Sequence, residues 1–363
     1  MELVEVGSKK DIDAFIKFPL SIYRNDLLYA PPLLREMKSQ FSKKNPFFDH
    51  AEVKLFLIKG KGRIASIINR RHIEFHNENV GFFGFFECIN DPEVSKTLFG
   101  RVSQELKKHA LEVMRGPMNF STNEECGFLL NGFDLPPMLM TPYNPSYYND
   151  LATSFGMQKS KDLFAYIYDV QDELPEKVLK VAGFAEKQGI SIRPISMKNF
   201  GSDMTAFKEI YNSSWHDNWG FIPLTDRELN FMAGRLKPVI VPELSLIAER
   251  KGEPIGFMGL LPDYNHVLRA MKGRLNPVTI IKAIYYSRRI KDLRLLLLGI
   301  KKDMRAKGVD ALLFREGFNT LKKKGFKRIE FSWVLEDNLP VQRIVRMLGG
   351  KLYKTYRIYE KGL

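Results

Sequence analysis

One stretch near the C-terminal end of the chain, Leu295–Leu313, constrains the fold more than any other. It begins with four consecutive leucines, Leu295–Leu298, a run short and apolar enough for a strand buried on both faces. A basic turn follows, and from Ala311 onward apolar residues recur at helical spacing. A strand that enters a helix through such a turn presents free backbone amides and the positive end of the helix dipole to a phosphate. The stretch therefore predicts an α/β fold with an anion site where this helix begins.

The turn between this strand and helix carries a family resemblance. Its sequence R-x-x-G-x-D, which begins at Arg305, is similar to the R/Q-x-x-G-x-G/A loop of the GNAT acyltransferases, which grips the pyrophosphate of acyl-CoA. Downstream, residues 330–334 resemble the fifth strand of that family, and residues 338–349 resemble its N-x-x-A-x-x-x-Y-x-x-x-G segment. With a terminal strand at 354–359, the resemblance covers residues 192–363 in the family's order.

The resemblance implies acetyl-CoA or a longer acyl-CoA as co-substrate, and two positions depart from the family pattern. Asp310 stands where the family has glycine or alanine; it suits the helix dipole as a cap but would repel a pyrophosphate if it pointed inward. Val345 replaces the tyrosine that often protonates the leaving thiolate. The turn at Arg305–Asp310 is the expected phosphate cradle. An aspartate in place of Gly308 is expected to put a charge in this cradle and weaken acyl-CoA binding. The implied cofactor-binding residues are Leu298, Gly299, Ile300, Arg305, Ala306, Lys307, Gly308, Val309, Asp310 and Asn338.

The chain contains one order of elements twice. With 363 residues it exceeds one comfortable core, and the order helix, hairpin, strand, helix, strand, helix, strand is predicted in both 1–168 and 191–363, joined by a linker helix in 169–190. In the first copy the turn at Ile89–Glu93 is acidic and lacks a basic glycine turn, so that copy is predicted to be degenerate for CoA. The predicted fold is therefore α/β, in the sense of an α+β sandwich, with two tandem GNAT-like acyl-CoA acyltransferase domains. The whole chain resembles the tandem GNAT-like group that includes bacterial ceramide synthases.

Composition and charge narrow the range of partners. A net charge of +14 and a pI near 9.5 favour an anionic partner: CoA, an anionic lipid or nucleic acid. Nucleic acid is disfavoured because the basic residues have no base-stacking sheet or recognition motif around them. Two cysteines, the lack of a secretory signal and the lack of an apolar run of about 20 residues predict a cytoplasmic protein, with membrane association left open. No metal is expected, because no Cys/His pair has the spacing of metal ligands.

Residues 263–294 form a basic amphipathic insertion in the second copy. Its basic residues alternate with apolar and aromatic ones, a pattern that suits a lipid headgroup interface. The same pattern fits a pair of packing helices whose lysines face water, and both interpretations stay open. The basic residues are Arg269, Lys272, Arg274, Lys282, Arg288, Arg289, Lys291 and Arg294.

Acyl transfer requires a base for the attacking amine, and two residues are candidates. Glu330 alternates with apolar neighbours in the predicted fifth strand, so its carboxylate faces either the cleft or solvent. His216 lies in an aromatic and polar loop where the acceptor is expected, and its pKa range suits a base. A surface histidine there is the plain alternative.

Five further residues are candidates for binding the acceptor. Trp215, Asn218 and Trp219 follow the first helix of the second copy, whereas Asn123 and Glu125 lie in the polar stretch 119–127, which could equally be a self-satisfied loop. The sequence thus predicts an acyl-CoA-dependent N-acyltransferase acting on a small-molecule or lipid amine. The alternative is a non-catalytic CoA- or lipid-binding protein on the same fold; acyl length and oligomeric state are left open.

Overall fold

The computed structural model describes residues 2–170 and 173–363, and its chain forms two compact units. Unit 1 contains Met1–Leu163, Asn265–Ser287 and Lys354–Leu363, and unit 2 contains Phe164–Tyr264 and Arg288–Tyr353. The chain passes from unit 1 to unit 2 within strand β7 (Gln158–Asp169) and returns to unit 1 within strand β13 (Lys351–Gly362).

These units differ from the boundaries expected at 1–168, 169–190 and 191–363. The terminal strand was expected to close the second copy, but its residues from Lys354 onward pair with strands of unit 1. The expected linker helix belongs to unit 2, and residues 171 and 172 of the linker lie outside the described residues. Long strands that serve two units are invisible to local patterns, because such patterns reveal a strand but not its partner.

Unit 1 is a sheet in the order β1-β2-β3-β4-β5-β13, with β6 also paired to β13. The β2–β3 hairpin and β4 confirm the hairpin and strand expected in the first copy, and the rings of Phe83 and Phe86 on β4 pack against Phe99 of helix α5. The other elements are β1 (Val4–Glu5), α1 (Lys9–Lys17), α2 (Pro19–Ile22), α3 (Leu34–Gln40), η1 (Pro46–Asp49), β2 (Ala51–Ile58), β3 (Gly62–Asn69), α4 (Arg70–His76), β4 (Val80–Cys88), α5 (Pro92–Lys107), β5 (Val113–Gly116), β6 (Phe128–Asn131), α6 (Tyr147–Ser154), α10 (Asn265–Met271) and α11 (Pro277–Ser287).

One strand of unit 1 was placed wrongly from sequence. The sequence pattern predicts a strand at 138–141 and an irregular polar stretch at 119–134, but residues 138–141 form a turn and β6 lies within 119–134. Strand β6 pairs with β13, where Leu129 lies opposite Tyr356. Asn144 completes it by accepting the Leu129 N–H at 2.6 Å. A four-residue strand held by a partner so distant in sequence leaves no local signal.

Unit 2 is a sheet in the order β7-β12-β11-β10-β9-β8. The sheet has helices on both faces. Among the described residues of the whole chain, no helix is long and apolar enough to cross a bilayer. Its elements are α7 (Glu176–Lys187), β8 (Ile190–Pro194), α8 (Phe200–Trp215), α9 (Asp226–Leu236), η2 (Pro242–Leu244), β9 (Ser245–Arg250), β10 (Glu253–Pro262), β11 (Asp292–Ile300), η3 (Lys302–Met304), α12 (Val309–Lys324), β12 (Arg328–Leu335) and α13 (Leu339–Met347).

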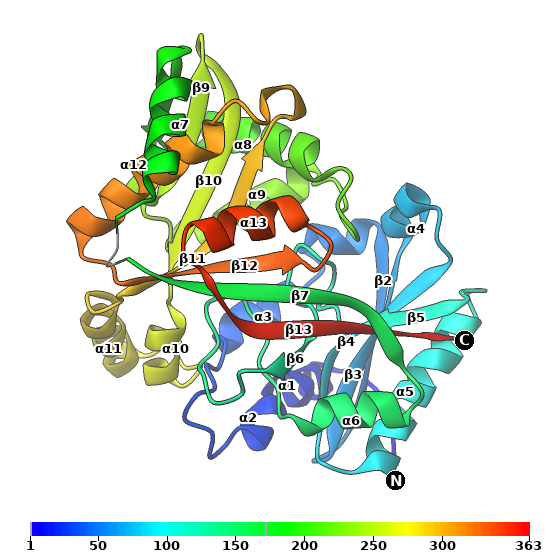
Figure 1. Ribbon diagram of the computed structural model, residues 1–363. Helices are drawn as coiled ribbons and strands as arrows, with labels where there is room; N and C mark the ends of the chain where they lie inside the picture. The colour runs from blue at the N-terminus through cyan, green and yellow to red at the C-terminus, as the bar shows by residue number, and fades with distance from the viewer. Residues whose placement is uncertain (1, 171–172) are drawn as a thin grey trace. The chain divides into compact units, whose positions relative to one another are not determined.

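Alternation along β10 sends neighbouring side chains to opposite helices. Met258 meets α12, where Gly317 leaves room for it, and Phe257 meets the ring of Phe207 on α8 at 4.9 Å between centroids. Helix α12 packs in turn against α7, the pair shown together in Figure 1. The apolar core of unit 2 therefore lies between the sheet and the α7–α12 pair.

Strands β11 and β12 separate partway along their length. They pair in parallel from Asp292 opposite Arg328 to Leu295 opposite Phe331, and their pairing ends there. Strand β11 nevertheless stays bonded to β10 as far as Ile300. The edges of the two strands beyond these last pairs are thus free of each other, and the gap opens beside the start of α12.

Candidate functional site

A groove of about 700 Å³ occupies the gap between the separated strands of unit 2. Its walls come from the ends of β11 and β12, the starts of α12 and α13, and the loop after α8. Most of the lining is apolar, including Leu296, Leu298 and Ile344. The expectation that the leucine run is buried on both faces was wrong beyond Leu295, because Leu296, Leu297 and Leu298 are half-exposed where β12 has left.

Helix α12 begins at this groove with unused amides. Gly308, its N-cap residue, has a left-handed φ of 78° and offers no side chain to the first turn. Among the described residues, the backbone N–H groups of Val309, Asp310 and Ala311 have no acceptor, while Leu312 already donates to the Gly308 carbonyl at 3.0 Å. Three orphan donors and the positive dipole end of a 16-residue helix make a site for an anionic group.

The structure distributes the ten expected cofactor-binding residues over two places. Seven of them line the groove: Leu298, Gly299, Ile300, Arg305, Ala306, Asp310 and Asn338. Lys307, Gly308 and Val309 do not, and a Cβ on Gly308 would lie 2.8 Å from Cγ1 of Val181 on α7. The reason given above for a Gly308 to aspartate effect is therefore wrong. A new side chain there would push on α7 rather than enter the cradle.

Three of the side chains that line the groove, Asp310, Arg305 and Asn338, differ in their contacts. The Asp310 carboxylate does not cap its helix and lies in the groove wall, near where a diphosphate would bind. Arg305 donates to the Ser214 carbonyl at 2.7 Å, which ties the cradle loop to the end of α8. Asn338 accepts the Val341 N–H at 3.3 Å and so caps α13.

Glu330 lies in a buried network, not at the surface. Its side chain is fully buried, and its Oε1 lies 3.6 Å from Nε of Arg294, the residue opposite it on β11. The Ser332 hydroxyl donates to Glu330 Oε1 at 2.5 Å and accepts from Arg294 Nε at 2.8 Å. The Tyr353 hydroxyl donates to the other carboxylate oxygen. A buried carboxylate with a cation and two hydroxyls is well satisfied.

Ser332 joins this network to the groove. Ser332 lines the groove, whereas Glu330 does not. Sequence reasoning missed Ser332 and Tyr353, although residues two apart on a strand share a face and Ser332 follows Glu330 at that spacing. Arg294 was assigned to the amphipathic insertion, but it lies in β11 and is 2% exposed.

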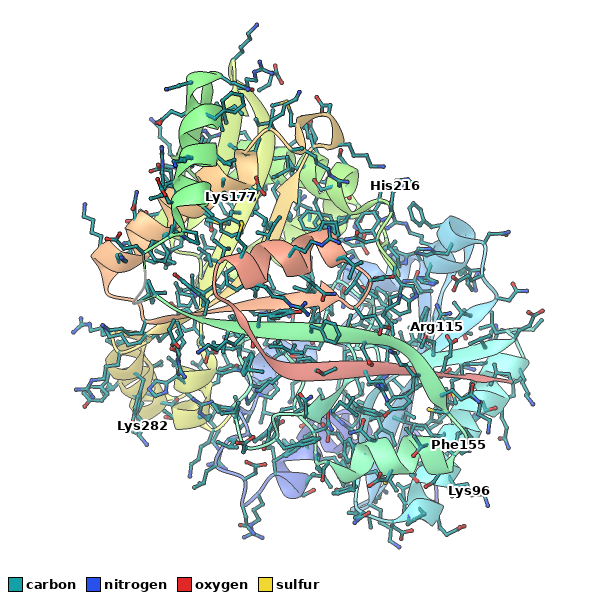
Figure 2. All side chains as sticks on the ribbon, in the orientation of Figure 1. Lys96, Arg115, Phe155, Lys177, His216 and Lys282 are labelled. Atoms are coloured by element: carbon teal, nitrogen blue, oxygen red, sulfur yellow. The ribbon has the colours of Figure 1, made fainter. Side chains whose placement is uncertain are left out.

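The loop after α8 contributes part of the groove wall. Trp215, Asn218 and Trp219 line the groove, and Trp215 packs on Gly299, where no side chain larger than hydrogen fits beneath the indole. His216 does not line it; its side chain, labelled in Figure 2, is 57% exposed and lies 3.0 Å from Asp217. Lys302 and His216 both lower the pKa of Asp217. His216 is thus part of a surface ion cluster.

Asn123 and Glu125 lie in unit 1, in a loop that satisfies its own polar groups. The Asn119 side chain donates to Glu125 at 3.3 Å, and the Asn123 N–H donates to the Ser121 hydroxyl at 3.2 Å. The structure thus brings three of the five expected acceptor residues to the groove of unit 2 and places these two in another unit.

Two further features bear on the chemistry of the groove. Val345 is 2% exposed and lines it, at the place where a tyrosine was noted as missing. Across the residues that the structure describes, no group of three or more histidine, cysteine, aspartate or glutamate side chains could hold a metal ion.

The chain is similar in sequence to known proteins along its whole length. Residues 204–349 match the model of the Acetyltransferase (GNAT) family. The chain is 32% identical over 375 aligned residues to "Bacterial ceramide synthase" from Caulobacter vibrioides, covering 100% of this chain and 98% of that protein. It is also 32% identical over 364 residues to "Protein YghO" from Escherichia coli, covering 98% and 93% of the two chains.

Solved structures share the fold at low identity. A tandem GNAT protein from the clavulanic acid biosynthesis pathway superposes with a TM-score of 0.59 and 11% identity, covering 99% of this chain and 98% of that one. A GCN5-related N-acetyltransferase from Sphaerobacter thermophilus gives a TM-score of 0.55 at 13% identity, covering 99% and 95%. These neighbours establish that the whole chain has the tandem architecture.

Proposed function

Because the chain belongs to the GNAT family of acyltransferases, we propose that it transfers a long acyl group from acyl-CoA to the amine of a long-chain or lipid acceptor. The observation that carries this proposal is the groove between the separated ends of β11 and β12. It has free strand edges for the amides of pantetheine and, at one end, the orphan amides of α12 for the diphosphate.

The lining of the groove supports a long acyl chain. A short acetyl group needs little apolar wall, whereas this groove offers leucine, isoleucine, phenylalanine and tryptophan side chains around about 700 Å³. Each buried methylene of a ligand contributes about 0.8 kcal/mol, so an apolar channel favours long chains over acetyl. The relative named bacterial ceramide synthase supports a long-chain amine as the acceptor class.

In the proposed reaction the amine nitrogen attacks the thioester carbonyl, the carbon–sulfur bond breaks, and CoA leaves as its thiolate. Ser332 accepts a hydrogen bond from the attacking amine, and Glu330 behind it orients the hydroxyl and stabilises the positive charge that forms on the nitrogen. Glu330 is thus a positioning residue here, not the direct base that sequence suggested. Val345, which lines the groove, has no ionisable proton, so we assign protonation of the thiolate to the ammonium formed on the acceptor nitrogen.

Release of free CoA thiol tests the proposal. The wild-type protein is incubated with acetyl-CoA or palmitoyl-CoA, each combined with a long-chain primary amine or a short polar amine. The proposal predicts thiol release chiefly with palmitoyl-CoA and the long-chain amine, and an amide product by mass spectrometry. Release only with acetyl-CoA and the short amine would refute the lipid assignment. Tight acyl-CoA binding without turnover for any pair would instead indicate the non-catalytic alternative.

A further inference from the structure

Helix α11 displays its apolar residues outward. Val278, Ile281, Ile284 and Tyr285 are 63%, 69%, 52% and 51% exposed, respectively. At 100° per residue these four positions fall within one arc of about 120° on the helix. Thr279 is the one buried residue of the helix, and it lies on the opposite side. A surface helix of a globular protein turns its apolar face toward the core and its polar face toward water. The outward apolar face of α11 therefore indicates a binding surface for an apolar partner.

The helix itself is well formed and anchored. The Asn276 side chain accepts the Thr279 N–H at 3.0 Å, while the Thr279 hydroxyl accepts the Asn276 N–H at 2.8 Å, a reciprocal cap ahead of α11. The Tyr286 ring packs against His266 of α10 at 5.4 Å. Helix α10 is tied to unit 1 because Asn265 donates to the Pro137 carbonyl at 3.0 Å. The exposed face is therefore presented by an ordered helical hairpin.

The charge around this face identifies its partner. Residues 265–287 contain four basic and no acidic side chains. Lys272, Arg274 and Lys282 are exposed, and none of them has an acidic partner among the described residues; Lys282 is labelled in Figure 2. Leu275, which is also exposed, follows Lys272 and Arg274 in the sequence and precedes α11. Apolar and aromatic side chains flanked by unpaired cations match the acyl boundary and anionic headgroups of a bilayer.

We propose that the α10–α11 hairpin docks the protein on anionic membrane surfaces, with Val278, Ile281, Ile284 and Tyr285 inserted below the headgroups. Lys272, Arg274 and Lys282 then lie at the level of the lipid phosphates. This docking stands apart from the proposed reaction, because it needs neither acyl-CoA nor turnover. A second copy of the chain is the competing occupant, but two such faces would bring like charges together.

Vesicle co-sedimentation of the full chain, without acyl-CoA, tests the proposal. We expect wild-type protein to bind phosphatidylcholine vesicles that contain phosphatidylglycerol. Its binding to pure phosphatidylcholine vesicles should be weaker by about tenfold or more. Ile281→Asp/Ile284→Asp should lower partitioning about tenfold or more, because two charges enter the face that must insert. The matched control Leu179→Asp/Phe184→Asp changes two exposed apolar residues of α7, 41% and 59% exposed, and should bind as wild type.

The electrostatic half of the proposal has its own pair of variants. Arg274→Glu/Lys282→Glu should lower binding about tenfold or more, since each basic residue near the surface contributes roughly a fivefold factor. Lys177→Glu/Lys323→Glu makes the same change in net charge on exposed residues of α7 and α12 and should have little effect. Equal loss in both pairs would reduce the effect to total charge and overturn the proposal.

Insertion can be followed directly with Tyr285→Trp. Its added emission should shift to shorter wavelength with anionic vesicles and be quenched by acyl-brominated lipid. Unchanged emission with bound protein would contradict insertion of α11. Light scattering separates the competing occupant: a wild-type dimer that Ile281→Asp/Ile284→Asp converts to monomer, with no vesicle binding by either, would assign the face to a second copy and overturn the proposal.

Discussion

The separated strands β11 and β12 of unit 2 have a counterpart in β4 and β5 of unit 1, and the two pairs differ just past their last paired residues. In unit 1 the pairing ends at Phe82 opposite Arg115. The chain then turns back onto β4: the Met118 N–H donates to the Phe83 carbonyl at 2.8 Å, and Asn119 accepts the Phe85 N–H at 2.7 Å. The space that forms a groove in unit 2 is thus filled by the protein's own chain in unit 1.

The two helix starts differ in the same way. In α5 the Asp91 carboxylate accepts N–H groups of Glu93 and Val94 at 2.9 and 3.3 Å, and Pro92 has no N–H to offer. In α12 the corresponding amides have no acceptor among the described residues, because Gly308 has no side chain. Unit 1 thus satisfies the amides at this helix start with its own side chain, whereas unit 2 leaves them open.

The residues one step before the last pairs also diverge. Unit 2 has Arg294 opposite Glu330, and unit 1 has Gly81 opposite Met114. A Cβ at Gly81 would lie 2.4 Å from Leu106, so that place in unit 1 is packed with apolar atoms. The charged network behind the groove is thus found in the copy that keeps the groove open.

The largest effect that would sharpen this comparison concerns Ser332. Ser332→Ala should lower kcat about 100-fold, because the hydroxyl that positions the attacking amine is lost, and should leave acyl-CoA affinity unchanged. It removes the link between groove and carboxylate but keeps the Arg294–Glu330 ion pair. The measurement is the rate of thiol release as a function of pH, and the acidic side of this rate profile should also change. Glu330→Gln is the companion variant. A wild-type rate and pH profile for both variants would contradict the proposed roles of Ser332 and Glu330.

Acid sensitivity should arise in unit 1, away from the groove. Burial lowers the pKa of His72 to about 3, helped by His76 and Arg115, with Glu78 at 3.9 Å. The unfolded chain binds this proton near pH 6.5 and the folded chain does not, so stability falls as pH drops between these values. Lowering pH from about 7 to about 5 should cost roughly 2 kcal/mol.

Urea unfolding of wild type and His72→Leu at both pH values measures this cost. The variant should lose that part of the pH dependence and bind acyl-CoA as wild type does. An identical pH dependence in the two proteins would show that His72 is not the acid-sensitive group.

Filling the groove of unit 2 should make it behave like unit 1. Val341 is half-buried on α13 and lines the groove. Val341→Trp should weaken palmitoyl-CoA binding about tenfold or more, equivalent to at least ~1.4 kcal/mol, because the indole takes the ligand's place. Thr153→Trp on the exposed side of α6 is the matched change in unit 1 and should leave affinity unaltered. Calorimetric titration decides; equal affinities for both variants would place the ligand elsewhere.

The smallest effects come from the two aspartates at the helix starts. Asp91→Ala should cost about 1 kcal/mol of stability through the lost cap and leave acyl-CoA binding untouched. Asp310→Ala should leave stability nearly unchanged and raise acyl-CoA affinity about threefold at low salt, because a charge near the diphosphate is removed. Thermal unfolding and titration at two salt concentrations test the pair. A stability loss at Asp310 equal to that at Asp91 would show that the two carboxylates do the same thing.

Much of this contrast could be predicted from the sequence. The leucine run, the basic glycine turn and the apolar-periodic helix are local patterns, and they located β11, the turn that follows it and α12 correctly. The acidic turn before α5 likewise indicated that unit 1 could not hold a diphosphate. Local hydrogen-bonding chemistry of this kind is written in consecutive residues, which is why it could be interpreted without a structure.

Other parts depend on contacts distant in sequence. Arg294 belongs to the buried network because β11 lies beside β12, and its position after a basic insertion suggested a surface role instead. Tyr353 reaches Glu330 from the strand that returns to unit 1. Position 308 has no room for a side chain because α7 packs closely against it. From the sequence, α7 was expected to be only a linker helix. Pairing and packing choose the neighbours, and one-dimensional patterns do not encode that choice.

Hydrogen–deuterium exchange with and without saturating palmitoyl-CoA tests the central claim most directly. The account predicts protection of amides at the end of β11 and at residues 309–311, with no change along β4 or the start of α5. Protection of β4 and α5, or no protection at the start of α12, would contradict the assignment of a single acyl-CoA groove to unit 2.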